Sequence, residues 1–253
     1  MRGLRFAWMA LLVVVAIAAA LWALPARWAM AWIPDSSPVV ITDASGTMWS
    51  ASATIAVGVG GLRRTLPDPL QWRLTFDGGP RLVLSHPWLR GPLALSPAWG
   101  GLRLSAQSLQ LPASALTTVH AMFNTLDPGG EVHLNWPELT LGRSVRARAA
   151  DSPLLTAQWR NASSSLTRIR PMGNYTLTLK QDAGDAIALE LKTGQGPLMM
   201  EGAGSLTRSS ARFDGQAWAQ KSASGDTQAA LQGLLAAIGP STGPDGQTLM
   251  KIR

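Results

Sequence analysis

The chain has 253 residues, enough for one or two domains with a hydrophobic core, and its composition excludes several classes of protein. It contains no cysteine, which rules out disulfides, thiolate catalysis and zinc sites built on cysteine. The net charge is +7, but the basic residues are dispersed and no nucleic-acid-binding module accompanies them. We therefore expect no nucleic-acid partner.

The N-terminal segment predicts attachment to a membrane. Residues 7–24 carry no charge, and a membrane-spanning helix needs about 20 mostly apolar residues. Arg2 and Arg5 precede this run, which favours a cytoplasmic N-terminus and places the rest of the chain across the membrane. A cleaved signal peptide with its site at 29–31 is the alternative. We expect a retained membrane helix.

Beyond residue 40 the sequence predicts β-strands. Trp72, Leu74 and Phe76 alternate with polar residues, and the same alternation of period two recurs later in the chain. A sheet with one buried and one solvent-exposed face requires this pattern. Turn signals rich in Gly, Asp and Pro separate the runs. The fold class is therefore predicted to be mainly β and antiparallel, with further strands in 131–136, 175–180 and 187–192.

Two segments have helical spacing instead. Apolar residues recur every three or four positions in 114–126 and in 226–239. Asp226 is the predicted N-cap of the second helix and Gly239 its predicted C-cap. Both segments are short amphipathic helices that could cover one face of a sheet.

The order of features along the chain predicts an internal duplication. Trp49 corresponds to Trp159, and GPL at 91–93 corresponds to GPL at 196–198, with one predicted helix after each copy. Chance matches between β segments rich in Gly and Pro are the alternative. We expect two similar copies of about 105 residues each, a scaffold architecture. The predicted domains are a cytoplasmic N-terminus at 1–6, a transmembrane helix at 7–24, an interfacial linker at 25–40, β repeat 1 at 41–142 and β repeat 2 at 143–253.

Trp49 follows a tight turn and has two competing interpretations. Gly46 supplies the turn, and Trp49 then marks the first strand of copy one, where it could pack over neighbouring strands. A binding platform for a ligand is the alternative. We favour the packing role.

The chain offers no recognisable catalytic constellation. His86, His120 and His133 lack the spacing of a metal site, and no nucleophile elbow is present. The glycine clusters at 58–61 and 202–204 lack a phosphate-loop lysine, so we expect bends in strands there. We predict a protein that is not an enzyme, with no catalytic, cofactor-binding or metal-binding residues.

A series of short motifs makes the chain resemble the type II secretion system protein N family. Each motif is weak alone, but their order and spacing over nearly the whole chain are specific. Ala51 is a departure, since glycine is expected after the Trp-Ser pair, and a positive φ there would make alanine costly. The motifs are GTMWSASA at 46–53, LQWRL at 70–74, LPASAL at 111–116, MGNYTLTL at 172–179, GQGPLMMEGAG at 194–204, FDGQAWA at 213–219 and LQGLLAAIG at 231–239.

The resemblance implies an accessory, single-pass inner-membrane component of the apparatus that moves folded exoproteins from the periplasm across the outer membrane. It implies no cofactor and no catalytic residue. We expect the periplasmic β domain to dock on other secretion proteins, the secretin or inner-membrane platform components, and exposed strand edges would suit this role. A membrane-tethered β groove for a lipid or another amphiphile is the alternative, lined by Trp72, Leu74, Phe76, Val132, Leu134 and Trp136.

Overall fold

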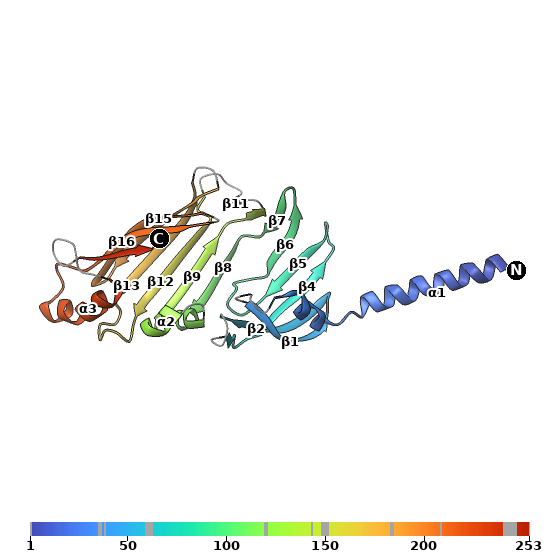
Figure 1. The fold of residues 1–253 in the computed structure, drawn as a ribbon, viewed down its shortest axis with the longest axis horizontal. Helices are drawn as coiled ribbons and strands as arrows, with labels where there is room; N and C mark the ends of the chain where they lie inside the picture. Colours follow the sequence, from blue (N-terminus) through green and yellow to red (C-terminus); the bar gives the residue numbers. More distant parts are fainter. Residues whose placement is uncertain are drawn as a thin grey trace. The chain divides into compact units, whose positions relative to one another are not determined.

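The chain folds into two compact units, Met1–His86 and Pro87–Arg253, and contains two antiparallel sheets of nine and eight strands (Figure 1). This confirms the prediction of a mainly β, antiparallel fold. The boundary between the two units lies between His86 and Pro87, whereas the two predicted repeats meet at residue 142. The internal duplication stays a prediction. The computed structural model describes residues 2–34, 37, 39–58, 63–118, 121–142, 144–147, 152–182, 185–207, 209–239 and 247–252.

Unit 1 holds two helical segments and five strands of the nine-stranded sheet. The strands pair in the order β1-β2-β4-β5, and β3 pairs with β2. Strand β4 confirms the predicted alternation, although Phe76 lies just beyond its end. The elements are α1 (Arg2–Trp22), the 3-10 helix η1 (Ala26–Trp32), β1 (Val39–Thr47), β2 (Ser50–Val57), β3 (Arg64–Thr65), β4 (Leu70–Thr75) and β5 (Arg81–Ser85).

Helix α1 lies where the sequence predicts a helix, but it does not meet the requirement for a membrane span. It ends at Trp22, and its first turns carry Arg2 and Arg5. The uncharged part of the helix is therefore 6–22. Among the residues that the structure describes, no helix combines the length and apolar character needed to cross a membrane. The transmembrane helix expected over 7–24 stays a prediction.

Unit 2 contains the remaining strands. Four of them are neighbours in the nine-stranded sheet, in the order β6 (Leu93–Ala98), β7 (Gly101–Leu104), β10 (Leu139–Gly142) and β11 (Val145–Ala147). The eight-stranded sheet confirms the strands predicted in 131–136, 175–180 and 187–192. Its order is β17 (Thr248–Ile252), β16 (Ala211–Ala219), β15 (Leu198–Leu206), β14 (Ile187–Gln195), β13 (Gly173–Gln181), β12 (Leu155–Ser163), β9 (Gly129–Trp136) and β8 (Gln107–Pro112).

The two predicted helices of the body are present, with different local structure. The first is divided into a 3-10 segment, η3 (Ala113–Thr118), and a short α-helix, α2 (Ala121–Leu126). The second is α3 (Gly225–Ile238), and Gly239 is its C-cap as predicted. The predicted N-cap Asp226 is wrong, because the Ser224 side chain accepts the hydrogen bond from the Thr227 amide. Asp226 lies in the first turn, where its negative charge interacts favourably with the helix dipole.

The core of unit 2 lies between these helices and one face of the eight-stranded sheet. Leu231 and Leu234 of α3 are buried against Leu198 of β15. The Tyr175 hydroxyl donates a 3.0 Å hydrogen bond to the Leu198 carbonyl, and burial raises the pKa of Tyr175. Trp159 packs against Tyr175 with ring centroids 5.8 Å apart. A second cluster under η3 contains Leu111, Ala113 and Val132.

Candidate docking surfaces

Trp49 connects the β1–β2 hairpin to the end of helix α1. It lies in the two-residue turn between β1 and β2, so it precedes the strand rather than forming part of it. Its indole nitrogen donates a 3.0 Å hydrogen bond to the Leu21 carbonyl at the end of α1, and its ring stacks on Trp22 at a centroid distance of 6.5 Å. The Met48 amide donates to the Leu24 carbonyl at 2.9 Å. These contacts satisfy carbonyl groups at the helix end and support the packing role of Trp49.

The glycine near the end of β1, Gly46, is needed, whereas Ala51 is not strained. Gly46 has a φ of +100°, and a Cβ there would lie 3.0 Å from the Cα of Ala51. Asp127 and Asn161 are the only non-glycine residues with positive φ in the part of the chain that the structure describes. Ala51 is therefore compatible with β2, and its departure from the family pattern leaves the strand intact.

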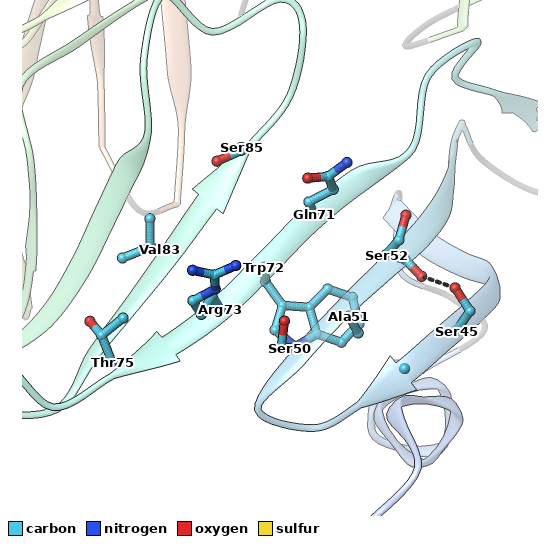
Figure 2. Close-up of a pocket in the computed structure, with 11 residues that line it drawn as sticks. Ser45, Ser50, Ala51, Ser52, Gln71, Trp72, Arg73, Thr75, Val83 and Ser85 are labelled. Atoms are coloured by element: carbon cyan, nitrogen blue, oxygen red, sulfur yellow. Dashed lines mark hydrogen bonds between the residues drawn. The ribbon is translucent and has the colours of Figure 1, made fainter.

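A pocket of about 580 Å³ lies over the sheet of unit 1. The strand register places Ser45, Ser52, Gln71 and Ser85 side by side in one row across β1, β2, β4 and β5. Figure 2 shows these polar side chains together with Arg73. Among the described residues that line the pocket there is no histidine or carboxylate to act as a general base for its serine hydroxyls. The surface therefore offers groups for hydrogen bonding.

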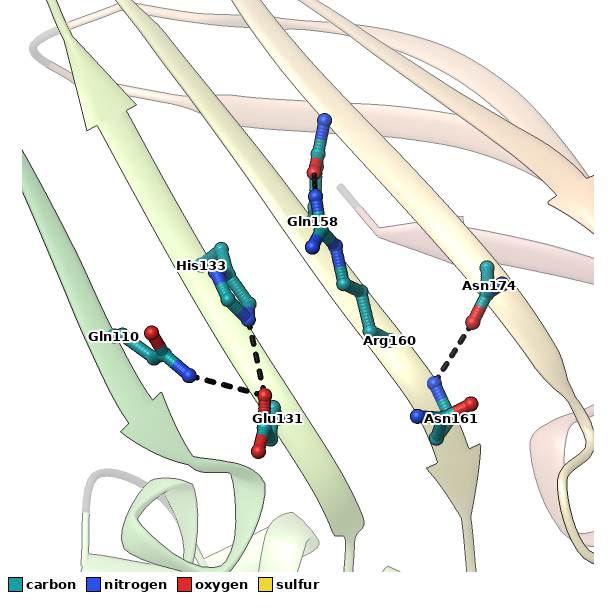
Figure 3. Close-up of polar contacts among 7 residues, drawn as sticks. All are labelled: Gln110, Glu131, His133, Gln158, Arg160, Asn161 and Asn174. Carbon is teal, nitrogen blue, oxygen red and sulfur yellow. Dashed lines mark hydrogen bonds and ion pairs between the residues drawn. The ribbon is translucent and has the colours of Figure 1, made fainter.

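The solvent-facing side of the eight-stranded sheet carries a second polar group (Figure 3). The Glu131 carboxylate accepts hydrogen bonds from the Gln110 amide at 3.1 Å and from His133 Nε2 at 3.2 Å. Between β12 and β13, the backbone amide of Asn161 donates a 2.8 Å hydrogen bond to the side-chain oxygen of Asn174. The contacts Gln110–Glu131 and Asn161–Asn174 cross between neighbouring strands and stabilise the register of the sheet, whereas His133 and Glu131 both belong to β9.

The structure brings none of the described histidines into a metal site. His86 Nε2 lies 3.2 Å from the Asp68 carbonyl oxygen in unit 1, and His133 contacts Glu131 in unit 2. His120 lies outside the described residues. Over those residues, no group of three or more His, Asp or Glu side chains is placed to hold a metal ion.

The sheet edges differ in how far they are covered. Among the described strands, β1 and β17 each pair on one side only, as do the short strands β3 and β11. The outer side of β8 is covered, because the Arg90 amide donates to the Ser108 carbonyl and the Gln110 amide donates to the Trp88 carbonyl. One end of β1 is bridged by Pro25, at Thr47. The edges β1 and β17 therefore remain candidates for strand addition.

The hairpin β6–β7 carries an exposed tryptophan that the sequence analysis missed. Trp99 and Gly100 form its two-residue turn, and Gly100 has a φ of +87°. The Trp99 side chain is fully exposed, and Leu102 on β7 is 49% exposed. A glycine directly after an aromatic residue between two short apolar runs is the hairpin signal that could have identified this tip. The register continues the apolar surface across the sheet as Pro97, Leu102, Leu141 and Val145.

The residues predicted to line a groove belong to two different units. Trp72 and Leu74 are half-buried on β4 of unit 1, and Phe76 is exposed beside the β4–β5 turn. The other three, Val132, Leu134 and Trp136, share one face of β9 in unit 2. Val132 is buried in the core under η3 and cannot contact a ligand, which corrects its assignment to a groove.

The fold is that of a mainly β protein with two antiparallel sheets, an exposed hairpin tip at Trp99 and strand edges at β1 and β17. A model of the family described as type II secretion system (T2SS), protein N, matches residues 37–250. The chain belongs to this family, whose members are structural components of type II secretion in the bacterial envelope. No curated protein and no solved structure matches the chain.

Proposed function

We propose that the chain is a non-enzymatic docking component of the type II secretion apparatus. Its β units lie in the periplasm and contact the secretin or inner-membrane platform components, which supports export of folded exoproteins across the outer membrane. Membership of the secretion family and the exposed surfaces of the sheets support this role. The observation that carries it is the fully exposed Trp99 at the tip of β6–β7.

An exposed tryptophan places a large apolar side chain in water, which is unfavourable unless a partner covers it. Trp buries a large apolar area and is enriched among the residues that dominate protein–protein binding energy. A rigid two-residue turn presents the Trp99 ring without a flexible loop, which keeps the entropy lost on binding small. Leu102, 49% exposed on β7, extends the apolar contact beside it. We assign this tip as the anchor for the partner protein.

Replacing Trp99 by serine is expected to reduce secretion of a type II exoprotein at least fivefold without unfolding the chain. Because the ring is exposed, the free energy of unfolding should change by no more than about 0.5 kcal/mol. Secreted and periplasmic exoprotein are measured by immunoblot in a strain that depends on this chain, and thermal unfolding of the purified variant is measured in parallel. Arg160→Ser is the matched control on the exposed face of β12.

Normal secretion by the Trp99→Ser strain would remove the hairpin tip from the proposal. Normal secretion by a strain that lacks the whole chain would contradict the proposed function itself. An equal loss of secretion with Arg160→Ser would show that the effect is not specific to the tip.

We also infer that α1 attaches the chain to the inner membrane. Its described apolar side chains are exposed, Leu12 at 64%, Val14 at 62% and Trp22 at 76%, and water is a costly environment for such a surface. Attachment through apolar contacts is insensitive to ionic strength. The full chain is therefore expected to stay with the membrane fraction after a wash in 1 M salt, about the range where charge contacts are screened. Release by that wash would contradict apolar attachment.

A further inference from the structure

We propose that unit 2 binds the alkyl chain of a single-chain amphiphile in an apolar trough on the helix-covered face of the eight-stranded sheet. This goes beyond docking and adds a ligand site. The trough is the part of that face that lies between the helix-covered core and strand β11. It consists of Leu155, Leu177, Leu179, Ile187, Leu189, Leu206 and Val145.

The strand register places the leucines of the trough side by side on one face of the sheet. Leu155, Leu179 and Leu189 are direct neighbours across β12, β13 and β14, and Leu177 pairs with Leu191 one step nearer the core. These side chains are half-buried, and neither of the two core clusters includes Leu179 or Leu189. Leucines in this position gain further burial only if something occupies the trough.

Both ends of the trough are defined. At one end Leu191 packs against the core that holds Leu231 and Leu234. At the other end a pocket of about 600 Å³ opens between β11 and the ends of β14 and β15. Apolar and polar side chains share this pocket, so an alkyl chain and a polar group can be accommodated together. Its lining residues are Gly142, Ser144, Val145, Asp185, Ile187, Leu206 and Thr207.

The size and chemistry of the trough favour an alkyl chain over a peptide. Leu191 lies four residue steps from Ile187 on β14, a length of about 13 Å. An extended alkyl chain of about ten carbons has this length. A peptide would bring backbone N–H and C=O groups onto a face of leucines that offers no hydrogen-bond partner, at a cost in free energy. The polar end of the amphiphile would meet Ser144, Asp185 and Thr207 at the pocket.

The test is photo-crosslinking of the full chain in intact cells with photo-leucine, a leucine analogue of similar size. After illumination the chain is purified, and adducts are located by mass spectrometry of its peptides. We expect adducts of lipid mass at Leu179 and Leu189 and none at the buried Leu231 and Leu234. The Trp99→Ser variant should keep these adducts, because the docking tip lies outside the trough.

A variant that fills the pocket provides a second test of the proposal. Ile187→Trp should lower the yield of lipid adducts at Leu189 at least fivefold, whereas Ala188→Trp places the same bulk on the opposite face and should not. Thermal unfolding shows whether each variant folds. If Ile187→Trp does not fold, the adduct map of the unaltered chain decides whether the trough binds lipid. Absence of lipid adducts at Leu179 and Leu189 overturns the proposal. Adducts there to a second copy or to another protein overturn it as well.

Discussion

Replacing Leu231 by alanine is expected to lower the free energy of unfolding of unit 2 by about 3 to 4 kcal/mol. Leu231 is fully buried, and it lies in the same cluster as Leu198, Tyr175 and Leu234. The substitution removes three carbon atoms from a close-packed site, so it loses their transfer free energy and leaves a cavity. Because this cluster joins α3 to the sheet, the loss should affect the whole unit.

Urea unfolding followed by circular dichroism measures this effect. Gln232→Ala is the matched control, since Gln232 is the next residue of α3 and is exposed. The control should change the free energy of unfolding by no more than about 0.5 kcal/mol. A Leu231→Ala variant as stable as Gln232→Ala would show that α3 does not pack on the sheet as described.

Replacing Gly130 by alanine is expected to cost at least about 2 to 3 kcal/mol. Gly130 has a φ of +93°, which alanine adopts only with strain. A Cβ at this position would also meet the carbonyl oxygen of Arg160 and lie 2.5 Å from that of Asn161. Both oxygens belong to the backbone, so the clash cannot be relieved by rotating a side chain. The strand pair β9–β12 must therefore shift.

Gly100 separates the two contributions to this cost. Its φ is +87°, but a Cβ there would meet nothing within 4 Å. Gly100→Ala should therefore cost only the conformational strain, about 1 kcal/mol. Thermal unfolding of both variants provides the comparison. Equal losses for the two variants would contradict the close approach of β9 and β12 at Gly130.

The strands could be predicted from the sequence because their signal is local. Alternation of apolar and polar residues marks β4, β9, β13 and β14, and Gly at positive φ marks several turns. The helix predicted over 114–126 was more difficult to predict in detail, because its single apolar stripe does not show that η3 and α2 are separate elements. The cap of α3 was misplaced by two residues because both Ser224 and Asp226 are good N-caps.

The surfaces could not be predicted, because exposure depends on contacts between segments that are distant in sequence. Trp49 and Trp99 both occupy hairpin turns, yet Trp49 meets Leu21 and Trp22 while Trp99 remains fully exposed. Nothing in the neighbouring residues distinguishes the two. Likewise, Val132 and Leu134 alternate regularly, but only the packing of η3 shows which of them is buried in the core.

The most direct test of docking is site-specific photo-crosslinking at position 99 in intact cells. A benzophenone amino acid replaces Trp99 in one strain and Arg160 in the control strain, and adducts are identified by mass spectrometry. Our account predicts an adduct from position 99 to the secretin or to an inner-membrane platform component, with none from position 160. Equal adducts from both positions, or no protein adduct from position 99, would contradict it.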